Sequence, residues 1–292
     1  MTDKLIATPS RTNEIMKKYN LKTKKSLGQN FITDPNILEK IVTTAQLDKF
    51  TNVVEVGPGI GGLTEILAQH SKKVLAYELD QRLLPVLADT LQQYDNITVL
   101  HQDVLQAHLA KDFAENFEAG PVKVVANLPY YITTPIMMHF LESDVEVAQL
   151  VVMMQKEVAE RITAKPNSKA YGSLSIAVQY FMDAQIAFIV PKTVFVPQPN
   201  VDSAILSLEK RSEPLVSVVD EKQFFKLVKG AFQLRRKTLW NNLLSMYGKD
   251  EAVRTWLTEA LQTAEIDPIR RGESLSIEDF ARLSNALVNS KL

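Results

Sequence analysis

No cysteine occurs among the 292 residues, which excludes disulfides, thiolate zinc sites and cysteine nucleophiles. No apolar run reaches the roughly 18 residues that a membrane helix needs, and the N-terminus is charged and polar where a signal peptide would be apolar. With 46% hydrophobic and 23% charged residues, the composition is that of an ordinary globular protein. We therefore expect a cytoplasmic monomer that binds neither a membrane nor a metal ion.

Net charge is also nearly absent, at a formal −1, but the charges are unevenly distributed along the chain. Residues 11–30 contain six Lys or Arg and one acidic residue, and residues 221–240 contain the same numbers. Residues 41–150, in contrast, contain six basic and fourteen acidic residues. Basic segments on both sides of an acidic middle predict a polyanion bound at the edges and a neutral or cationic ligand in the centre.

Between about residues 52 and 150, short β-rich runs alternate with longer segments that carry apolar residues at helical spacing. This alternation predicts an α/β fold, in which helices cover both faces of a mostly parallel sheet. The expected strands are Asn52–Val56, Lys73–Glu78, Ile97–His101, Lys123–Asn127, Ala148–Met153, Ala184–Ile189 and Ala204–Glu209, and the expected helices are Leu63–His70, Gln81–Tyr94, Thr134–Leu141 and Leu174–Phe181.

A segment with a proline and several polar residues, Lys210–Val219, has the composition of a linker. Beyond it, every periodic segment has the apolar spacing of a helix. We therefore expect two domains: a Rossmann-like domain at residues 1–210, and a smaller all-α domain at residues 211–292 that binds RNA.

The first expected strand runs into a glycine-rich loop at residues 55–64. Glycines there let the backbone turn tightly and approach a ligand, and the N-terminus of the next helix faces that ligand. Gly57, Gly59 and Gly62 fit the dinucleotide pattern, whereas Gly57, Gly59 and Gly61 fit the pattern usual in enzymes that use S-adenosylmethionine (SAM). The loop therefore predicts a nucleoside cofactor and leaves its identity open.

Two carboxylates follow at the ends of the next two strands. Glu78, 21 residues after Gly57, can accept two hydrogen bonds from a ribose diol, in NAD as well as in SAM. Asp103 can accept a bond from an adenine amino group, although a lone aspartate is more often a turn or cap residue. Both positions support a nucleoside cofactor without choosing one.

The segment Asn127-Leu128-Pro129-Tyr130, after the fourth strand, favours SAM. The side-chain oxygen of Asn127 and the carbonyl of Leu128 can accept hydrogen bonds from the two protons of an adenine N6. Pro129 restricts the preceding residue and so orients that carbonyl, and Tyr130 can stack on the purine. These roles predict methyl transfer to N6 without a general base. Phe195 is expected either to cover the other face of the base or, equally, to be a core residue.

The basic segments predict an RNA ligand. Lys17–Asn30 has no helical or strand pattern, whereas Lys222, Lys226, Lys229 and Arg236 recur at helical spacing. Cations on one helical stripe suit a phosphate backbone. The residues expected to contact RNA are Lys24, Lys25, Lys222, Lys226, Lys229, Arg235, Arg236 and Lys237.

From Lys24 to about Leu287, the sequence closely resembles the ribosomal RNA adenine dimethyltransferase family. The resemblance rests on the motif at residues 27–31 (LGQNF), the glycine loop, Asn127–Tyr130, and residues 155–161, 195–203 and 236–239. It implies a SAM-dependent methyltransferase sheet. The residues expected to hold SAM are Asn30, Ile32, Gly57, Gly59, Gly61, Glu78, Asp103 and Asn127.

The full-length helical tail resembles the housekeeping branch of that family. This resemblance implies N6,N6-dimethylation of two adjacent adenosines near the 3′ end of small-subunit (16S) ribosomal RNA, within a small ribosomal subunit particle during its assembly. The sister branch methylates large-subunit RNA and confers macrolide resistance. This sequence departs from the family pattern at Trp240, where we expect a basic residue.

Two alternatives from other classes remain. A NAD-dependent oxidoreductase accounts for the glycine loop and Glu78 but leaves Asn127–Tyr130 and both basic segments without a role. A non-catalytic RNA-binding assembly factor accounts for the basic segments, but the intact Asn127–Tyr130 segment argues against it.

Overall fold

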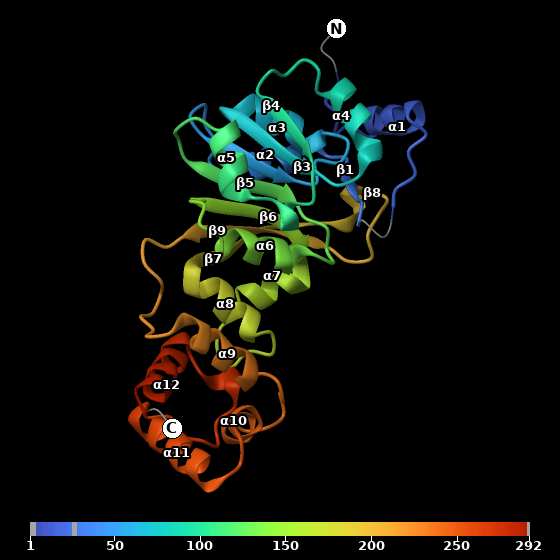
Figure 1. Cartoon of the computed structure of the whole chain (residues 1–292). Coiled ribbons are helices and arrows are strands. Elements are labelled where there is room, and N and C mark those ends of the chain that lie inside the picture. The colour runs from blue at the N-terminus through green and yellow to red at the C-terminus, as the bar shows by residue number, and fades with distance from the viewer. Residues whose placement is uncertain (1–3, 25–27, 291–292) are drawn as a thin grey trace. The chain divides into compact units, whose positions relative to one another are not determined.

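The computed structural model describes residues 4–24 and 28–290 (Figure 1). Its contacts divide the chain into two compact units, Met1–Ala159 with Gln185–Lys210, and Glu160–Ala184 with Arg211–Leu292. We call them the sheet unit and the helical unit. The chain passes finally into the helical unit after residue 210, where we expected the boundary. Residues 160–184, which we expected in the first domain, belong instead to the helical unit.

The sheet has seven strands in the order β4-β3-β2-β5-β6-β9-β7. Strands β2 to β6 pair in parallel with their neighbours, and β9 is antiparallel to β6. Every residue of β2 is buried, as expected when both faces of a sheet are covered. The mostly parallel sheet is therefore confirmed. The strands are β2 (Asn52–Val56), β3 (Lys73–Glu78), β4 (Ile97–His101), β5 (Val122–Asn127), β6 (Gln149–Gln155), β7 (Met182–Val190) and β9 (Ser203–Lys210).

Helices follow most strands and pack on the sheet (Figure 1). The helices of this part of the chain are α1 (Pro9–Lys18), α2 (Pro35–Thr44), α3 (Gly62–His70), α4 (Leu84–Thr90), α5 (Leu109–Asn116), α6 (Thr133–Leu141) and α7 (Lys156–Ile162). The sequence analysis did not predict α1, α2, α5 or α7. A local signal for α2 exists, because Asp34 caps it by accepting a hydrogen bond from Asn36 N and a proline occupies the first helical position.

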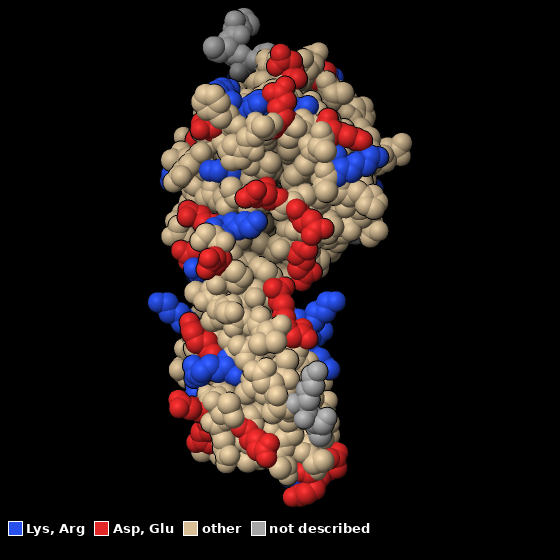
Figure 2. All heavy atoms as spheres, turned by 60° about the vertical axis from the view of Figure 1, so that its left-hand side comes forward, with Lys and Arg blue, Asp and Glu red and all other residues tan. Residues whose placement is uncertain are grey.

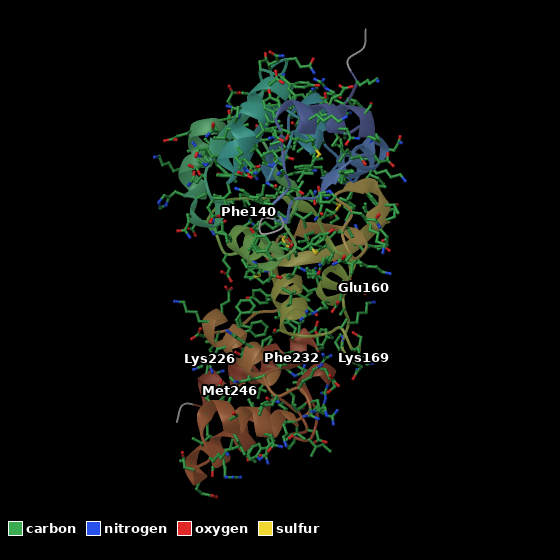
Figure 3. All side chains as sticks on the ribbon, turned by 90° about the vertical axis from the view of Figure 1, so that its right-hand side faces the viewer. Phe140, Glu160, Lys169, Lys226, Phe232 and Met246 are labelled. Atoms are coloured by element: carbon green, nitrogen blue, oxygen red, sulfur yellow. The ribbon has the colours of Figure 1, made fainter. Side chains whose placement is uncertain are left out.

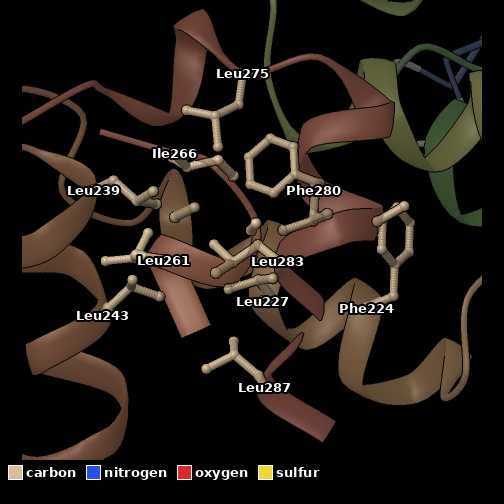
Figure 4. Packing of buried hydrophobic residues seen from close by; sticks show 14 of the residues in the cluster. Phe224, Leu227, Leu239, Leu243, Leu261, Ile266, Leu275, Phe280, Leu283 and Leu287 are labelled. Atoms are coloured by element: carbon tan, nitrogen blue, oxygen red, sulfur yellow. The ribbon is translucent and has the colours of Figure 1, made fainter. Parts of the chain in front are cut away.

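The helical unit contains α8 (Ser173–Phe181), α9 (Glu221–Ala231), α10 (Leu239–Tyr247), α11 (Glu251–Thr263) and α12 (Ile277–Asn289). Residues 160–184 belong here because Tyr171, Ile176 and Tyr180 are buried in the same apolar cluster as the C-terminal helices. Figure 4 shows the centre of that cluster, where Leu227 of α9 lies beside Leu283 of α12, the helix that also carries Phe280. No described helix combines the length and the apolar character needed to cross a bilayer.

Candidate active site

The strand order reverses between β2 and β5, because the chain adds β3 and β4 on one side of β2 and adds β5 and β6 on the other. In parallel sheets, ligands bind at the carboxyl ends of the strands where the order reverses. A crevice with about 970 Å³ of empty space, part of it open to solvent, lies there. Its lining includes these expected site residues: Asn30, Ile32, Gly57, Gly59, Glu78, Asp103, Asn127 and Pro129.

The glycine loop forms the wall of the crevice between β2 and α3. Gly57, Gly59 and Gly61 have φ values of +71°, +63° and +94°, which L-residues with side chains rarely adopt. A Cβ at Gly57 would project into open space, whereas a Cβ at Gly59 would lie 2.9 Å from the ring of Phe31. The glycines therefore permit both the turn and the close approach of the N-terminal segment.

Glu78 ends β3 and is 5% exposed. Its Oε1 accepts a hydrogen bond from Asp80 N at 2.7 Å, and its Oε2 accepts one from Gly59 N at 3.3 Å. Burial raises the pKa of Glu78 above its ordinary value although these two bonds act in the opposite direction. Each oxygen keeps a lone pair that can accept a hydrogen bond from a hydroxyl group, which fits the diol of a ribose.

A second buried carboxyl, which the sequence analysis did not single out, lines the same crevice. Glu55 of β2 is 1% exposed, and its Oε2 has no hydrogen-bond partner among the described residues. Burial, with a smaller contribution from Glu78, raises the pKa of Glu55 to about 8. A hydrogen bond from the Thr64 side chain opposes this rise. The sequence signal of Glu55 is a glutamate inside a continuous apolar strand. A buried acidic side chain with one oxygen unpartnered at the crevice fits a ligand that forms a hydrogen bond with it.

Asp103 lies at the crevice and also has the capping role considered for it. It lines the crevice and caps the short helix η3 (Val104–Gln106), because its Oδ1 accepts a hydrogen bond from Leu105 N at 3.0 Å. The cap uses one carboxylate oxygen and leaves the other available to a ligand.

Asp80 connects the N-terminal segment to the rim of the crevice. It caps the helix η2 (Gln81–Leu83) and also accepts hydrogen bonds from Gln29 Nε2 at 3.0 Å and from Lys24 Nζ at 3.4 Å. The Arg82 side chain, whose Nη2 lies 2.6 Å away, holds the pKa of Asp80 well below its ordinary value. Lys24, which we expected to contact RNA, therefore has an acidic partner. Lys25 lies outside the described residues.

The Asn127 side chain lies at the base of the crevice with a defined orientation. Its Nδ2 donates a hydrogen bond to the carbonyl of Asn30 at 3.1 Å, so its Oδ1 is the free acceptor. Leu128 N donates to Met153 O at 3.2 Å, which holds the segment against β6, and the Leu128 side chain is buried. Asn127 Oδ1 is therefore the polar side-chain atom that this segment offers to a ligand.

The two tyrosines of this segment have different environments. The hydroxyl of Tyr130 forms a 2.7 Å hydrogen bond with Ser203 Oγ of β9, and Tyr130 is half-buried and outside the crevice lining. Burial raises its pKa. Tyr131, which the sequence analysis did not select, lines the crevice and is 55% exposed. The aromatic ring directly at the mouth is thus that of Tyr131.

Phe195 is a core residue, which is one of the two roles expected for it. The short strand β8 (Phe195–Val196) pairs antiparallel with β1 (Phe31–Ile32), and Phe195 faces Ile32 in this pairing. The side chain is 3% exposed and belongs to the apolar cluster between sheet and helices. Phe195 does not line the crevice, so the expectation that it covers a base is not met. Its pairing partner Ile32 does line the crevice.

The expected basic stripe on the helical unit is shorter than predicted. Lys222, Lys226 and Lys229 are exposed along α9, and Lys226 Nζ lies 5.9 Å from the ring centre of Tyr247 (Figure 3). Because α9 ends at Ala231, the expectation that Arg236 continues this stripe is wrong.

The remaining expected cations, Arg235, Arg236 and Lys237, lie on the turn after α9. Arg235 forms an ion pair with Glu273 at 3.7 Å and donates a hydrogen bond to the carbonyl of Lys169. On the face in Figure 2, basic and acidic side chains are interspersed rather than separated. In the described parts of the chain, no cluster of three or more His, Asp or Glu side chains is suited to a metal ion.

Comparisons with known proteins agree with this geometry. The family described as ribosomal RNA adenine dimethylase matches residues 20–287. A ribosomal RNA small subunit methyltransferase A from Enterococcus faecalis is 69% identical over 100% of this chain and 99% of its own length, and one from Ligilactobacillus salivarius is 60% identical over 97% and 96%. A dimethyladenosine transferase structure from Plasmodium falciparum aligns with a TM-score of 0.72 at 25% identity, over 86% of this chain and 95% of its own. The 23S rRNA methyltransferase ErmE aligns with a TM-score of 0.66 at 28% identity, over 88% and 99%.

Proposed function

The chain belongs to the ribosomal RNA adenine dimethylase family, and we propose that it dimethylates two adjacent adenosines near the 3′ end of small-subunit ribosomal RNA. The enzyme is a SAM-dependent methyltransferase that acts on ribosomal RNA. Relatives with 69% and 60% identity are named for the small subunit, whereas the large-subunit enzyme ErmE is 28% identical, and this difference supports the small-subunit target. We further propose that the enzyme acts as a monomer on an assembling small-subunit particle.

The residues of the crevice fit SAM. Glu78 would accept hydrogen bonds from the ribose hydroxyls, and Asp103 would accept one from the adenine amino group. The glycine loop would allow the cofactor to approach the protein main chain closely. Glu55 would face the cationic part of the molecule. When bound, SAM supplies an electrophilic methyl group on a sulfonium.

The protein must place an adenine N6 beside that methyl group and make its lone pair available. Asn127 Oδ1 and the Leu128 carbonyl would accept the two N6 protons, which draws the lone pair out of conjugation with the ring. Because these oxygens are already oriented by the bonds to Asn30 and Met153, little reorganisation accompanies the reaction. The transferred methyl makes the nitrogen acidic, so its proton leaves to water. We propose that Tyr130 or Tyr131 stacks on the purine.

The observation that carries this proposal is the free Oδ1 of Asn127, oriented by Asn30 at the point where the strand order reverses. Asn127→Ala should lower methyl transfer from tritium-labelled SAM to small-subunit particles by about 10²-fold or more, by analogy with the loss of one preorganised polar group. RNA affinity in a filter-binding assay should stay near wild type, since phosphate contacts supply most of it.

The matched control is Asn36→Ala, at an exposed position of α2 away from the crevice, which should retain full activity. Transfer by Asn127→Ala at the wild-type rate would reject the assigned site. Mass spectrometry of ribosomal RNA from cells that lack the protein tests the finer proposal. Loss of methyl groups from the large subunit, with the small subunit unchanged, would overturn the assigned target.

A further inference from the structure

Two loops of the helical unit lie against each other beside the start of α10. One is the turn at residues 232–238, and the other is the loop at residues 267–273. The N–H groups of Leu239 and Trp240 donate to two carbonyls of the second loop, at 2.6 and 3.2 Å. Gly272 permits the close packing, since a Cβ there would lie 2.7 Å from the last carbonyl oxygen of α9. We call these two segments the loop pair.

The loop pair borders a hollow that has no role in the methyl-transfer chemistry. It contains about 470 Å³ of empty space, including open solvent, and is lined by Thr238, Trp240, Thr258, Pro268 and Ile269. The Trp240 side chain is half-buried against the core, whereas Ile269 is 72% exposed. An indole and an exposed aliphatic side chain offer stacking and apolar contact to an unpaired nucleobase. The Thr238 hydroxyl, which accepts hydrogen bonds as the cap of α10, keeps its proton for a ligand, whereas the Thr258 hydroxyl donates its proton to the Arg254 carbonyl at 2.8 Å.

Exposed cations without acidic partners lie on the two loops that border the hollow, although none of them lines it. Arg236, Lys237 and Arg271 are exposed on the loop pair, and none forms an ion pair within the part of the chain that the structure describes. Arg235 differs, because Glu273 neutralises it at 3.7 Å. Unpaired cations next to an apolar hollow complement a nucleotide, whose base is apolar on its faces and whose phosphates are anionic.

Side-chain hydrogen bonds fix the conformation of both loops beside the hollow. Asn242 is almost fully buried, and its Oδ1 accepts a hydrogen bond from Leu234 N at 2.9 Å, while its Nδ2 donates to the Thr238 carbonyl at 3.2 Å. On the other loop, the Asp267 carboxylate accepts a hydrogen bond from Ile269 N at 3.0 Å. Both loops are therefore preorganised, which lowers the entropic cost of binding.

We propose that this hollow binds one unpaired nucleotide of the ribosomal RNA, with the base against Trp240 and Ile269 and the adjoining phosphates at Arg236, Lys237 and Arg271. The inference deepens the proposed function and rests on it for the class of ligand. A protein partner fits less well, because it would bury three cations that have no acidic partner here.

The chain has two tryptophans, so Trp256→Phe leaves Trp240 as the only indole reporter. In this background we would titrate single-stranded hexaadenylate, an RNA duplex of the same length and inorganic polyphosphate, all without SAM. We expect saturable quenching of Trp240 emission by hexaadenylate, and little by the duplex or by polyphosphate, since neither presents a free base. Equal quenching by polyphosphate, or none at saturating hexaadenylate, overturns the proposal.

Substitutions separate stacking from folding. Trp240→Ala should weaken hexaadenylate binding about 5- to 150-fold, the equivalent of roughly 1–3 kcal/mol for one stacked base, and Trp240→Phe should restore much of it. Ile269→Ser lies outside the core and should also weaken binding. Val219→Ser, at another exposed aliphatic position of the helical unit, is the matched control and should not.

If Ile269→Ser lowered affinity for the ribosomal particle but left hexaadenylate binding unchanged, the hollow would contact protein and the proposal would fail. Because these titrations contain no SAM, their outcome is independent of the Asn127→Ala test. Failure of the hollow and failure of the methyl-transfer site can thus be told apart.

Discussion

The buried carboxyl of Glu55 makes the stability of the sheet unit depend on pH in a direction that can be worked out. Burial raises its pKa from the ordinary 4.5 to about 8. Between these values the folded protein holds a proton that the unfolded chain has released, so the free energy of unfolding falls as pH rises through this window. The contribution of Glu55 is fully present below about pH 4.5 and is lost by about pH 8.

The magnitude follows from the width of that window. Each pH unit corresponds to about 1.4 kcal/mol for a single group, so a window of roughly 3.5 units sets an upper bound of about 5 kcal/mol. Glu55→Gln keeps the shape of the side chain and removes the titration. The free energy of unfolding of the variant should therefore exceed that of the wild type increasingly as pH rises from 5 to 8.

The assay is urea unfolding followed by far-ultraviolet circular dichroism at pH 5, 6, 7 and 8, without SAM, with the wild type and the variant compared at each pH. Glu209→Gln, an exposed glutamate at the end of β9, is the matched control and should follow the wild type. If Glu55→Gln and the wild type changed in parallel over this range, the folded protein would not hold the proton on Glu55 and our account of the crevice would be wrong.

Replacing Lys226, Lys229 and Arg236 with Gln should weaken RNA binding and reduce the slope of log affinity against log salt by roughly 2–3, because up to three phosphate contacts are lost; an unchanged slope in filter-binding titrations would exclude these cations from the interface. Gly59→Ala should lower the affinity for SAM in calorimetry and destabilise the fold by about 1–2 kcal/mol, since φ is +63° and the new Cβ would meet an aromatic ring at 2.9 Å. Gly172→Ala, where no atom lies within 4 Å of the added Cβ and φ is not left-handed, should have little effect on SAM binding; similar losses in both variants would contradict the reasoning.

Much of the sheet unit could be predicted from local sequence. The bounds of β2, β3 and β4 agree with the expected ones, because each is a mainly apolar run limited by glycine or polar residues. β2 and most of β3 are buried, whereas β4 at the edge of the sheet is only partly buried. The order of the motifs along the chain also located the crevice. Since parallel strands present their carboxyl ends at one edge, Gly57, Glu78, Asp103 and Asn127 had to meet there.

The sequence predictions that the structure contradicts share a physical cause. The side chain of Phe195 is directed by Ile32, which lies 163 residues away in the sequence, and Arg236 leaves the stripe because α9 stops five residues earlier. Residues 160–184 join the helical unit through contacts with helices that form much later in the chain.

The sequence by itself thus determined the class of fold and the order of the site residues along the strands, since these follow from residue pattern and spacing. Its motifs also carry the resemblance to the enzyme family. Only the tertiary structure decided which aromatic ring lines the crevice, which carboxyl remains unpaired and which cations lack partners. A side chain's environment depends on residues that are distant along the chain, and local pattern does not encode them.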